Sequence, residues 1–157
     1  LYRAREEGRL HRNFMGYTTQ NTGMMLGLGV SSISDTGTAF AQNEKALHDY
    51  YAAVNGNRLA IKKGYVLSVE DVAFKKYILD ISCKGATTFE DEHLPLLKAH
   101  TFPVLDNLAA DGLVIRDKKG VKLTAQGHYF IRVVCSAFDL YLQRGQQSGK
   151  PIFSKAI

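Results

Sequence analysis

Residues 13–34 hold the side chains best suited to chemistry, because a polar run is followed closely by an apolar run that glycines interrupt. The polar run, residues 13–19, reads NFMGYTT, and the glycine-containing run, residues 27–34, reads GLGVSSIS. Residues 24–33 predict a short buried strand, although glycine weakens a strand through lost packing and a larger loss of backbone entropy. Glycines in such a strand indicate that another backbone or a ligand comes close.

The glycine pattern of residues 27–32 does not predict a dinucleotide site. It lacks the third glycine of G-x-G-x-x-G, and it lies within the predicted strand, whereas the dinucleotide loop follows a strand and opens a helix. Tyr17, Thr18, Thr19 and Gln20 could line the mouth of a substrate site. Ordinary turn residues would give the same pattern.

The cysteines, histidines and acidic residues of the sequence do not form a recognisable metal-binding or catalytic pattern. Cys83 and Cys135 lie far apart in apolar stretches, and we expect both to be buried free thiols. Two thiols cannot hold a four-iron cluster. Asp106 and Asp111 flank a predicted helix end, and an acid–base pair there is conceivable but poorly supported. The histidines, none of which stands four residues from another, predict no metal site: His11, His48, His93, His100 and His128.

Short helices and strands must position these residues. Gly8 ends a first helix, residues 34–38 form a loop, and Asn43 starts a helix that reaches about residue 54. Ser68 and Asp71 form a box-like cap on a helix at 69–83. The remaining expected elements are an extended pair at 59–61 and 65–67, helical pieces at 90–97 and 102–110, a hairpin at 113–116 and 121–123, a helix from Thr124 to about residue 143, and a flexible joint at 145–149 before a short tail.

Length and composition suit one ordinary domain, since 45% of the 157 residues are hydrophobic. The expected fold is mainly α with a small β component, and it ends in a winged-helix-like arrangement. No apolar run of 18 or more residues is present, and the charged amino terminus is not a signal peptide. We therefore expect a cytoplasmic protein, and we expect it to be a monomer.

The net charge of +5 permits an anionic partner but does not name one. The basic residues of the predicted hairpin outnumber its acid by three: Arg116, Lys118, Lys119 and Lys122 against Asp117. Such a wing often meets phosphates, so a winged-helix module that binds nucleic acid or protein is the rival hypothesis. The helix that would enter a DNA groove, residues 102–110, has no Arg or Lys, which disfavours nucleic acid.

Six segments together resemble one enzyme family: residues 10–20 (LHRNFMGYTTQ), 26–34 (LGLGVSSIS), 41–43 (AQN), 111–114 (DGLV), 123–127 (LTAQG) and 153–157 (FSKAI). They are similar to the carboxy-terminal part of the oxygen-independent coproporphyrinogen III oxidases, radical S-adenosylmethionine enzymes of haem biosynthesis. The resemblance covers essentially the whole chain. It implies that residues 1–43 are the last strand and flanks of an upstream β/α barrel, and that residues 44–157 form a carboxy-terminal helical, winged-helix-like domain.

The family's cofactors are S-adenosylmethionine and a 4Fe–4S cluster. The resemblance implies that the CxxxCxxC motif for this cluster lies upstream of Leu1 in the parent enzyme. This chain is then a fragment with no catalytic residue and no metal ligand of its own, and we expect it to bind no cofactor and to be inactive alone.

The implied reaction is oxidative decarboxylation of two propionate groups of coproporphyrinogen III to vinyl groups, giving protoporphyrinogen IX. A porphyrinogen with four carboxylates suits the positive charge as well as nucleic acid does. The related haem chaperones differ here, because they carry a His-Asn and a Tyr-Trp pair that Arg12-Asn13 and Gly16-Tyr17 do not reproduce. A chaperone function stays open for a divergent chain.

The resemblance also implies which residues meet the ligands. Ile33 would touch S-adenosylmethionine, and Met15 and Gly29 would stand at cofactor-facing positions. We expect familiar members to have glutamine in place of Met15, and methionine cannot donate a hydrogen bond. The expected substrate-binding residues are Arg12, Tyr17, Thr18 and Gln20. On grounds of charge alone, Arg12, Lys62 and Lys63 could meet the propionates.

Overall fold

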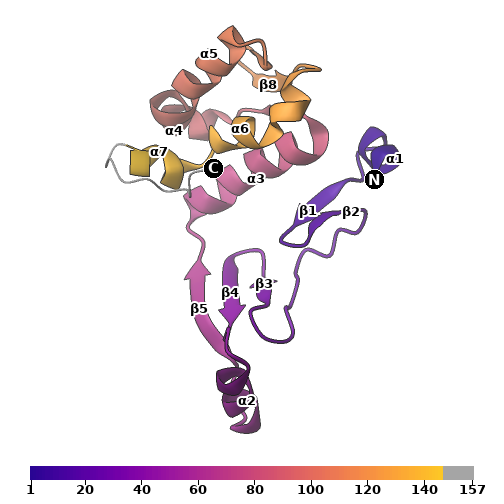
Figure 1. Cartoon of the computed structure of the whole chain (residues 1–157). Coiled ribbons are helices and arrows are strands. Elements are labelled where there is room, and N and C mark those ends of the chain that lie inside the picture. Colours follow the sequence, from indigo (N-terminus) through magenta and orange to yellow (C-terminus); the bar gives the residue numbers. More distant parts are fainter. Residues whose placement is uncertain (147–157) are drawn as a thin grey trace, which may run out of the picture.

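The structure, a computed structural model, describes residues 1–146. The expected joint at 145–149 falls mostly outside these residues, and the tail at 153–157 falls wholly outside them. A helical lobe (residues 67–146) forms one end of the molecule, and a narrow tongue (residues 24–66) extends from it (Figure 1). A small arm (residues 1–23) lies beside the lobe. Helix and strand both contribute to the fold.

The arm consists of a short helix and a two-stranded hairpin. Helix α1 spans Tyr2–Glu6, and Gly8 follows it with φ 67°, as predicted. Strand β1 (His11–Asn13) pairs antiparallel with β2 (Gly16–Thr18), which sets Arg12 opposite Tyr17. The sequence does not predict this hairpin, because strands of three residues are too short to show alternation.

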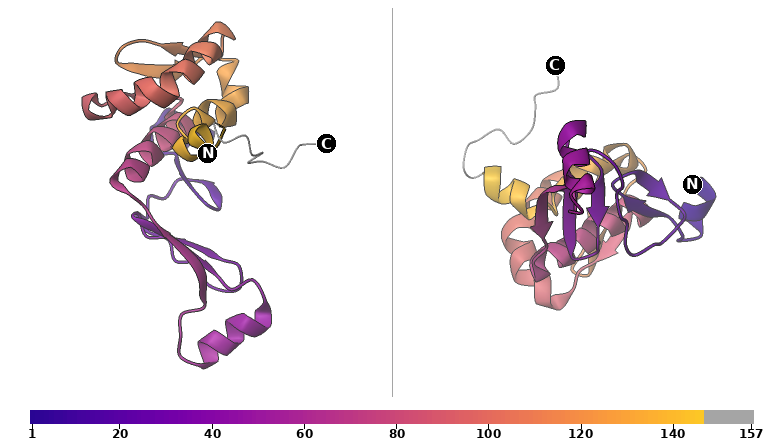
Figure 2. Two further views of the ribbon diagram at one scale, coloured as in Figure 1. Left: turned by 90° about the vertical axis from the view of Figure 1, so that its left-hand side faces the viewer. Right: turned by 90° about the horizontal axis from the view of Figure 1, so that it is seen from below.

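The tongue is a three-stranded antiparallel sheet of order β3-β4-β5, with one helix at the end farthest from the lobe (Figure 2). The β4–β5 register shifts between Gln42 and Asn43, which pair with Lys63 and Ile61, so the extra residue is Lys62 of β5. The elements are β3 (Ile33–Asp35), β4 (Ala39–Asn43), α2 (Leu47–Asn55) and β5 (Ile61–Val66).

Residues 24–33 are not the buried strand that was expected. Met25 forms an isolated bridge to Asp35 and Ile33 begins β3, but Leu26 and Leu28 between them are 68% and 89% exposed. A strand of this composition needs an apolar layer against it. Within residues 1–146 no such layer covers Leu26 or Leu28, so the run folds as an irregular segment beside β3.

Three other expectations for the tongue are also wrong. The loop expected at residues 34–38 is shorter, because β3 and β4 close around it as a hairpin. Asn43 is the last residue of β4, so the following helix begins at Leu47. Residues 59–61 and 65–67 do not pair with each other, because most of this stretch is the single strand β5, which pairs with β4.

The lobe packs helices around a three-stranded sheet of order β6-β8-β7. The predicted hairpin is present as β7 and β8, and β6 adds a strand that the sequence does not predict. The elements are α3 (Val69–Lys84), β6 (Ala86–Thr88), η1 (Asp91–His93), α4 (Leu94–Leu96), η2 (Leu97–Thr101), α5 (Phe102–Ala110), β7 (Val114–Arg116), β8 (Gly120–Leu123), η3 (Gly127–Phe130), α6 (Ile131–Ser136) and α7 (Leu140–Gln146).

Helix α3 is the central element of the lobe, and both of its predicted ends are confirmed. The Ser68 hydroxyl accepts a hydrogen bond from the Asp71 backbone N–H (3.1 Å), and the Asp71 carboxylate accepts one from the Ser68 N–H (2.8 Å). Gly85 closes the helix in the left-handed conformation, with φ 74°. Tyr77 and Ile81 of α3 are fully buried in the core, beside side chains such as Phe138.

Two predicted helices of the lobe differ in detail. The pieces expected at 90–97 and 102–110 belong to one nearly continuous helical stretch that contains the π-helical turn η2, with Pro103 tolerated in the first turn of α5. The helix expected from Thr124 to residue 143 breaks into η3, α6 and α7. Phe138 is fully buried at the break, and Asp139 accepts a hydrogen bond from the Leu142 N–H (3.0 Å) at the start of α7.

Among the described helices, none is both long enough and apolar enough to cross a membrane.

Replacing Gly85 with alanine should destabilise the lobe. An L side chain in the left-handed region costs about 1–2 kcal/mol, and a Cβ on Gly85 would lie 2.8 Å from His128 Cε1 and 3.2 Å from Arg5 Nη2. Gly112→Ala is the matched control, because Gly112 has φ 72° and its Cβ would meet nothing within 4 Å. Urea unfolding should show the larger loss for Gly85→Ala. Equal losses would mean that His128 and Arg5 move aside freely.

Acid should release α1 from the lobe. Arg5 Nη2 donates a hydrogen bond to His128 Nδ1 (2.8 Å), and burial, followed by the charge of Arg5, lowers the pKa of His128 below its usual 6.5. The stabilisation is therefore complete above pH 6.5 and is lost as pH falls through the lower pKa of the folded state. NMR shifts of the α1 amides should follow this titration in the wild type but not in His128→Gln. An identical titration in both would contradict the assignment.

Candidate functional site

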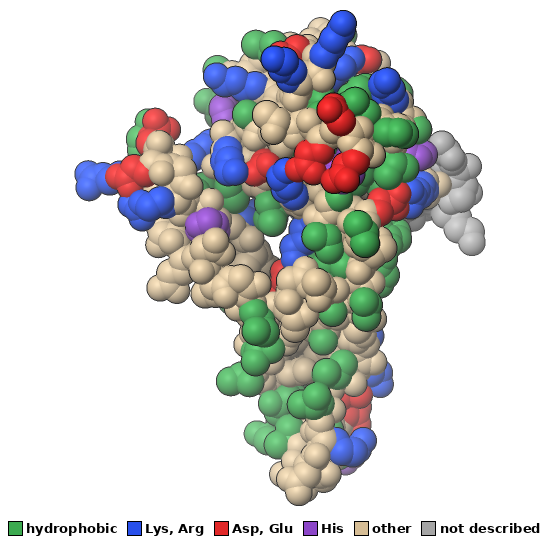
Figure 3. All heavy atoms as spheres, turned by 180° about the vertical axis from the view of Figure 1, so that it is seen from behind, with side chains coloured by type: hydrophobic (Ala, Val, Ile, Leu, Met, Phe, Trp, Pro, Cys, Tyr) green, Lys and Arg blue, Asp and Glu red, His purple; other side chains and the backbone are tan. Residues whose placement is uncertain are grey.

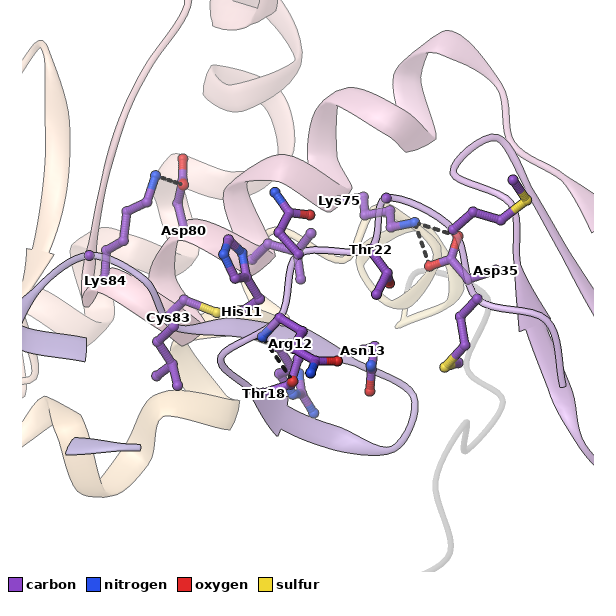
Figure 4. Close-up of a pocket in the computed structure, with 18 residues that line it drawn as sticks. His11, Arg12, Asn13, Thr18, Thr22, Asp35, Lys75, Asp80, Cys83 and Lys84 are labelled. Atoms are coloured by element: carbon purple, nitrogen blue, oxygen red, sulfur yellow. Dashed lines mark hydrogen bonds and ion pairs between the residues drawn. The ribbon is translucent and has the colours of Figure 1, made fainter. Parts of the chain in front are cut away.

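A pocket of about 270 Å³ lies where the arm faces helix α3 (Figure 4). Its walls come from β1, from the connector that follows β2, from the end of β3, and from one face of α3. The polar side chains labelled in Figure 4 lie around it: His11, Arg12, Asn13, Thr18, Thr22, Asp35, Lys75, Asp80 and Lys84. Segments far apart in the chain thus meet at one concave surface.

Arg12 is the positive charge in this pocket that lacks a carboxylate partner among residues 1–146. The two lysines are neutralised, since Lys75 bonds Asp35 (2.9 and 3.0 Å) and Lys84 bonds Asp80 (2.7 Å). The Arg12 guanidinium instead lies over the ring of Tyr17, 5.7 Å from its centre. An exposed guanidinium stacked on an aromatic ring can still offer a bidentate face to a carboxylate.

Lys75 also joins the three parts of the molecule. Its ammonium lies 4.8 Å from the centre of the Phe40 ring on β4, and Phe40 makes an edge contact with Phe14 of the arm, with ring centres 5.0 Å apart. Lys75 of the lobe thus contacts two residues of the tongue, Asp35 and Phe40. Phe40 in turn contacts the arm. Of this cluster of Lys75, Asp35, Phe40 and Phe14, the ion pair of Lys75 and Asp35 lines the pocket.

Residues 27–32 form a compact loop that folds back on Ile33. A Cβ on Gly27 would lie 2.7 Å from the Ile33 carbonyl oxygen, so only glycine fits. The expectation that another backbone comes close is confirmed at this position. Gly29 has φ 96°, its N–H donates to the Tyr50 hydroxyl (3.2 Å), and a Cβ would meet nothing within 4 Å. The loop therefore has one packed face and one open face.

No family model matches the chain. The oxygen-independent coproporphyrinogen III oxidase of Escherichia coli strain K12 is 39% identical over 98% of this chain and 35% of its own length. The Pseudomonas aeruginosa enzyme of that name is 36% identical over 90% of this chain and 32% of its own length. In the solved structure described as "Coproporphyrinogen III oxidase (HemN) from Escherichia coli is a Radical SAM enzyme", the matching part has a TM-score of 0.78 and 38% identity, covering 88% of this chain and 33% of that one.

The chain is a relative of the oxygen-independent coproporphyrinogen III oxidases. The match fits the carboxy-terminal portion of these oxidases. The chain spans about a third of the length of the first of these relatives.

The structure brings together some of the residues that the oxidase resemblance implied, and separates others. Arg12, Thr18 and Gln20 all line the pocket, and Tyr17 lies against Arg12. The Thr18 hydroxyl accepts the Gln20 N–H (3.1 Å), which is also what a simple turn would do. Lys62 and Lys63 are on β5 outside the pocket lining, and Lys62 bonds Glu44 (3.4 Å).

The three implied cofactor positions do not share this pocket. Gly29 and Ile33 belong to the tongue, where Ile33 pairs with Gln42 of β4. Met15 lies in the turn of the arm hairpin, is 87% exposed, and donates its backbone N–H to Asn13 (2.8 Å). The arm hairpin and the tongue nevertheless meet through the Phe14–Phe40 contact.

Sequence reasoning missed the contribution of α3 to the pocket. Lys75, Leu79, Asp80, Cys83 and Lys84 all line it. They recur at spacings of three and four residues, which places them on one face of a helix. That spacing was the available signal, but it does not reveal what the face would meet.

Both cysteines are free thiols. Cys83 is buried, as expected, whereas Cys135 is only partly buried. Burial raises the pKa of both thiols, so thiolates are disfavoured. Ser82 and Cys135 are within hydrogen-bond distance (3.3 Å). Within the described residues these thiols do not fit an iron–sulfur cluster, which takes three or four thiolate ligands.

One cluster of possible metal ligands is already hydrogen-bonded to neighbouring side chains. Potential metal ligands of Glu90, Glu92 and His93 lie within 4.8 Å of one another, but Lys76 bonds Glu90 and lowers the pKa of its carboxyl, and Tyr77 bonds His93 (2.8 Å). Such exposed acidic groups are common without a metal.

In the β7–β8 hairpin, Arg116 bonds Asp106 and lies 4.5 Å from the centre of the Phe102 ring. A phosphate would therefore have to compete with Asp106 for Arg116.

Removing the ammonium of Lys75 should destabilise the whole chain. Lys75→Met keeps the aliphatic stem but leaves Asp35, whose side chain is 18% exposed, without its cation. We expect a loss of about 1–3 kcal/mol, reduced from the buried-pair value by partial exposure. Lys76→Met is the neighbouring control, since its pair with Glu90 is more exposed and should contribute much less to stability. Equal losses in denaturant melts would refute the special role of Lys75.

Proposed function

We propose that this chain is the carboxy-terminal part of an oxygen-independent coproporphyrinogen III oxidase. The parent would convert two propionates of coproporphyrinogen III to vinyl groups with loss of carbon dioxide, giving protoporphyrinogen IX. The similarity to enzymes of this name over 98% of the chain carries the proposal. We place the parent in the cytoplasm, as a monomer.

The domain organisation is part of the proposal. Residues 1–43 would complete a β/α barrel whose earlier strands precede this chain. Because β5 pairs with β4, we extend this first part to about Val66 rather than dividing the sheet at residue 43. The rest would be a winged-helix-like domain, supported by the order helix, strand, helices, wing hairpin and by the sheet order β6-β8-β7. With Arg116 held by Asp106, we do not propose nucleic acid as its partner.

The exposed apolar side chains of the tongue suit a surface that another part of the protein covers. Leu26, Leu28, Leu59 and Val66 are each more than two-thirds exposed, and hydrophobic side chains gather along the tongue (Figure 3). Contiguous apolar surface of this kind marks an interaction site. We propose that the barrel part of the same protein covers it, and that the chain alone is therefore inactive.

The cofactor assignments divide between this chain and the barrel. The cluster would be held by cysteines of the barrel, since Cys83 and Cys135 do not fit it. When bound there, cluster and S-adenosylmethionine would supply the radical chemistry. The space beside Gly29 is open, and we propose that Ile33 and Gly29 contact S-adenosylmethionine there. Met15 would add an apolar contact, because its thioether offers no donor.

The pocket beside the arm is the proposed place for part of the substrate. Arg12 would bind one propionate with its guanidinium, and Thr18 and Gln20 would add polar contacts. Tyr17 would hold the Arg12 plane in place by stacking.

Anaerobic turnover of coproporphyrinogen III by the full-length protein tests the proposal. Arg12→Gln should raise KM by about tenfold, the worth of one charge-assisted hydrogen bond, with a smaller change in kcat. Arg132→Gln, an exposed arginine on α6, should leave both constants unchanged. No turnover by the wild-type protein under reducing conditions with S-adenosylmethionine would overturn the function. Normal KM in Arg12→Gln would overturn only the substrate assignment.

A further inference from the structure

Asn43, the last residue of β4, holds the loop at residues 27–32 with its side-chain amide. Asn43 Nδ2 is a donor to the Gly27 carbonyl (3.3 Å), the Gly29 carbonyl (3.0 Å) and the Ser32 hydroxyl (3.0 Å). Its backbone N–H also donates to the Ser32 carbonyl (3.0 Å). The β4–β5 register shifts beside Asn43, because Gln42 pairs with Lys63 and Asn43 with Ile61.

The loop needs this support because parts of its backbone are strained. Ser31 has φ 60°, which is unfavourable for a residue other than glycine and persists only where the surroundings impose it. The Ser31 N–H is bound by the Glu44 carbonyl (2.8 Å), and its carbonyl accepts from the Gln42 amide (3.2 Å). Asn43 adds contacts at both ends of the loop, so its amide links them directly.

Two of the three Asn43 contacts are carbonyl oxygens, which can only accept hydrogen bonds. The position therefore requires a donor. Aspartate has nearly the same size and shape, but ionised it offers only acceptors and would bring a negative charge against both carbonyls. The exchange of asparagine for aspartate thus isolates the hydrogen bonds from the packing.

We propose that Asn43 is a positioning residue that sets the loop at residues 27–32 in the shape that presents Gly29 and Ile33 to S-adenosylmethionine. The link to Ile33 is direct, because the Cα of Gly27 packs against the Ile33 backbone and Asn43 holds the Gly27 carbonyl. Ser32, held by its hydroxyl and carbonyl, immediately precedes Ile33. This inference rests on the proposed function, since it names the cofactor of that enzyme.

The test is Asn43→Asp in the full-length protein with its cluster reconstituted. Equilibrium dialysis should show the Kd for S-adenosylmethionine rising about tenfold, as expected for loss of the donor contacts. Hydrogen exchange at the Gly29 and Ser31 amides should become faster, while the Tm of the helical lobe should hardly change. Asn107→Asp, an exposed residue of α5, adds the same charge elsewhere and should change none of these quantities.

The outcomes separate this inference from the proposed function. If the wild type binds S-adenosylmethionine and Asn43→Asp binds it equally well, Asn43 has no positioning role. If Asn107→Asp weakens binding as much, the effect is one of charge and the inference fails. If the wild type does not bind S-adenosylmethionine at all, the proposed function fails and the cofactor part of the inference with it. Hydrogen exchange then still decides whether Asn43 holds the loop, and unchanged exchange would overturn that part as well.

Discussion

The arrangement of the molecule depends on one partly buried ammonium group, that of Lys75. It bonds the Asp35 carboxylate and lies over the Phe40 ring, which in turn touches Phe14. The arm and the tongue are small and have few fully buried side chains, whereas the core cluster lies in the lobe. An ammonium that is partly removed from water gains more from a carboxylate and an aromatic face than a surface lysine does. The pocket exists because this cluster holds the arm and the tongue against α3.

The surface of the tongue reflects a second constraint, the shortage of apolar partners. A sheet one layer thick buries only the side chains that meet another layer. Within residues 1–146, strand β5 is exposed at all six of its residues. The chain also spans only about a third of its curated relatives. Under the proposed function, the apolar surface is exposed because the barrel part that would cover it is not in this chain.

The loop at residues 27–32 depends on glycines for its backbone conformation and on Asn43 for its hydrogen bonds. Gly27 allows the close approach to Ile33, and Gly29 takes a φ that side chains disfavour. Neither residue holds the loop in place, because glycine brings no side-chain contact. Side-chain hydrogen bonds come from Gln42 and Asn43 at the end of β4 and from Tyr50 of α2. The apolar run that looks like a strand is therefore a loop whose order comes from polar neighbours.

Much of the lobe could be predicted from the sequence because its signals are local. Ser68 and Asp71 begin α3, Gly85 ends it, and the alternation around a glycine turn marks β7 and β8. The similarity to the oxidases could also be recognised, because it is carried by continuous strings of residues such as LHRNFMGYTTQ. Of the candidate site, the sequence alone determined Arg12, Thr18 and Gln20 as residues of one region.

Only the tertiary structure decided what these residues meet. Strands of three residues, such as β1, β3 and β6, form because a partner strand offers hydrogen bonds, and no local pattern announces the partner. The same holds for the α3 face of the pocket and for Asn43, whose side chain bonds acceptors 11 to 16 residues earlier in the chain. Local propensity determines a residue's own conformation, whereas burial and hydrogen bonding between distant segments determine which residues it contacts.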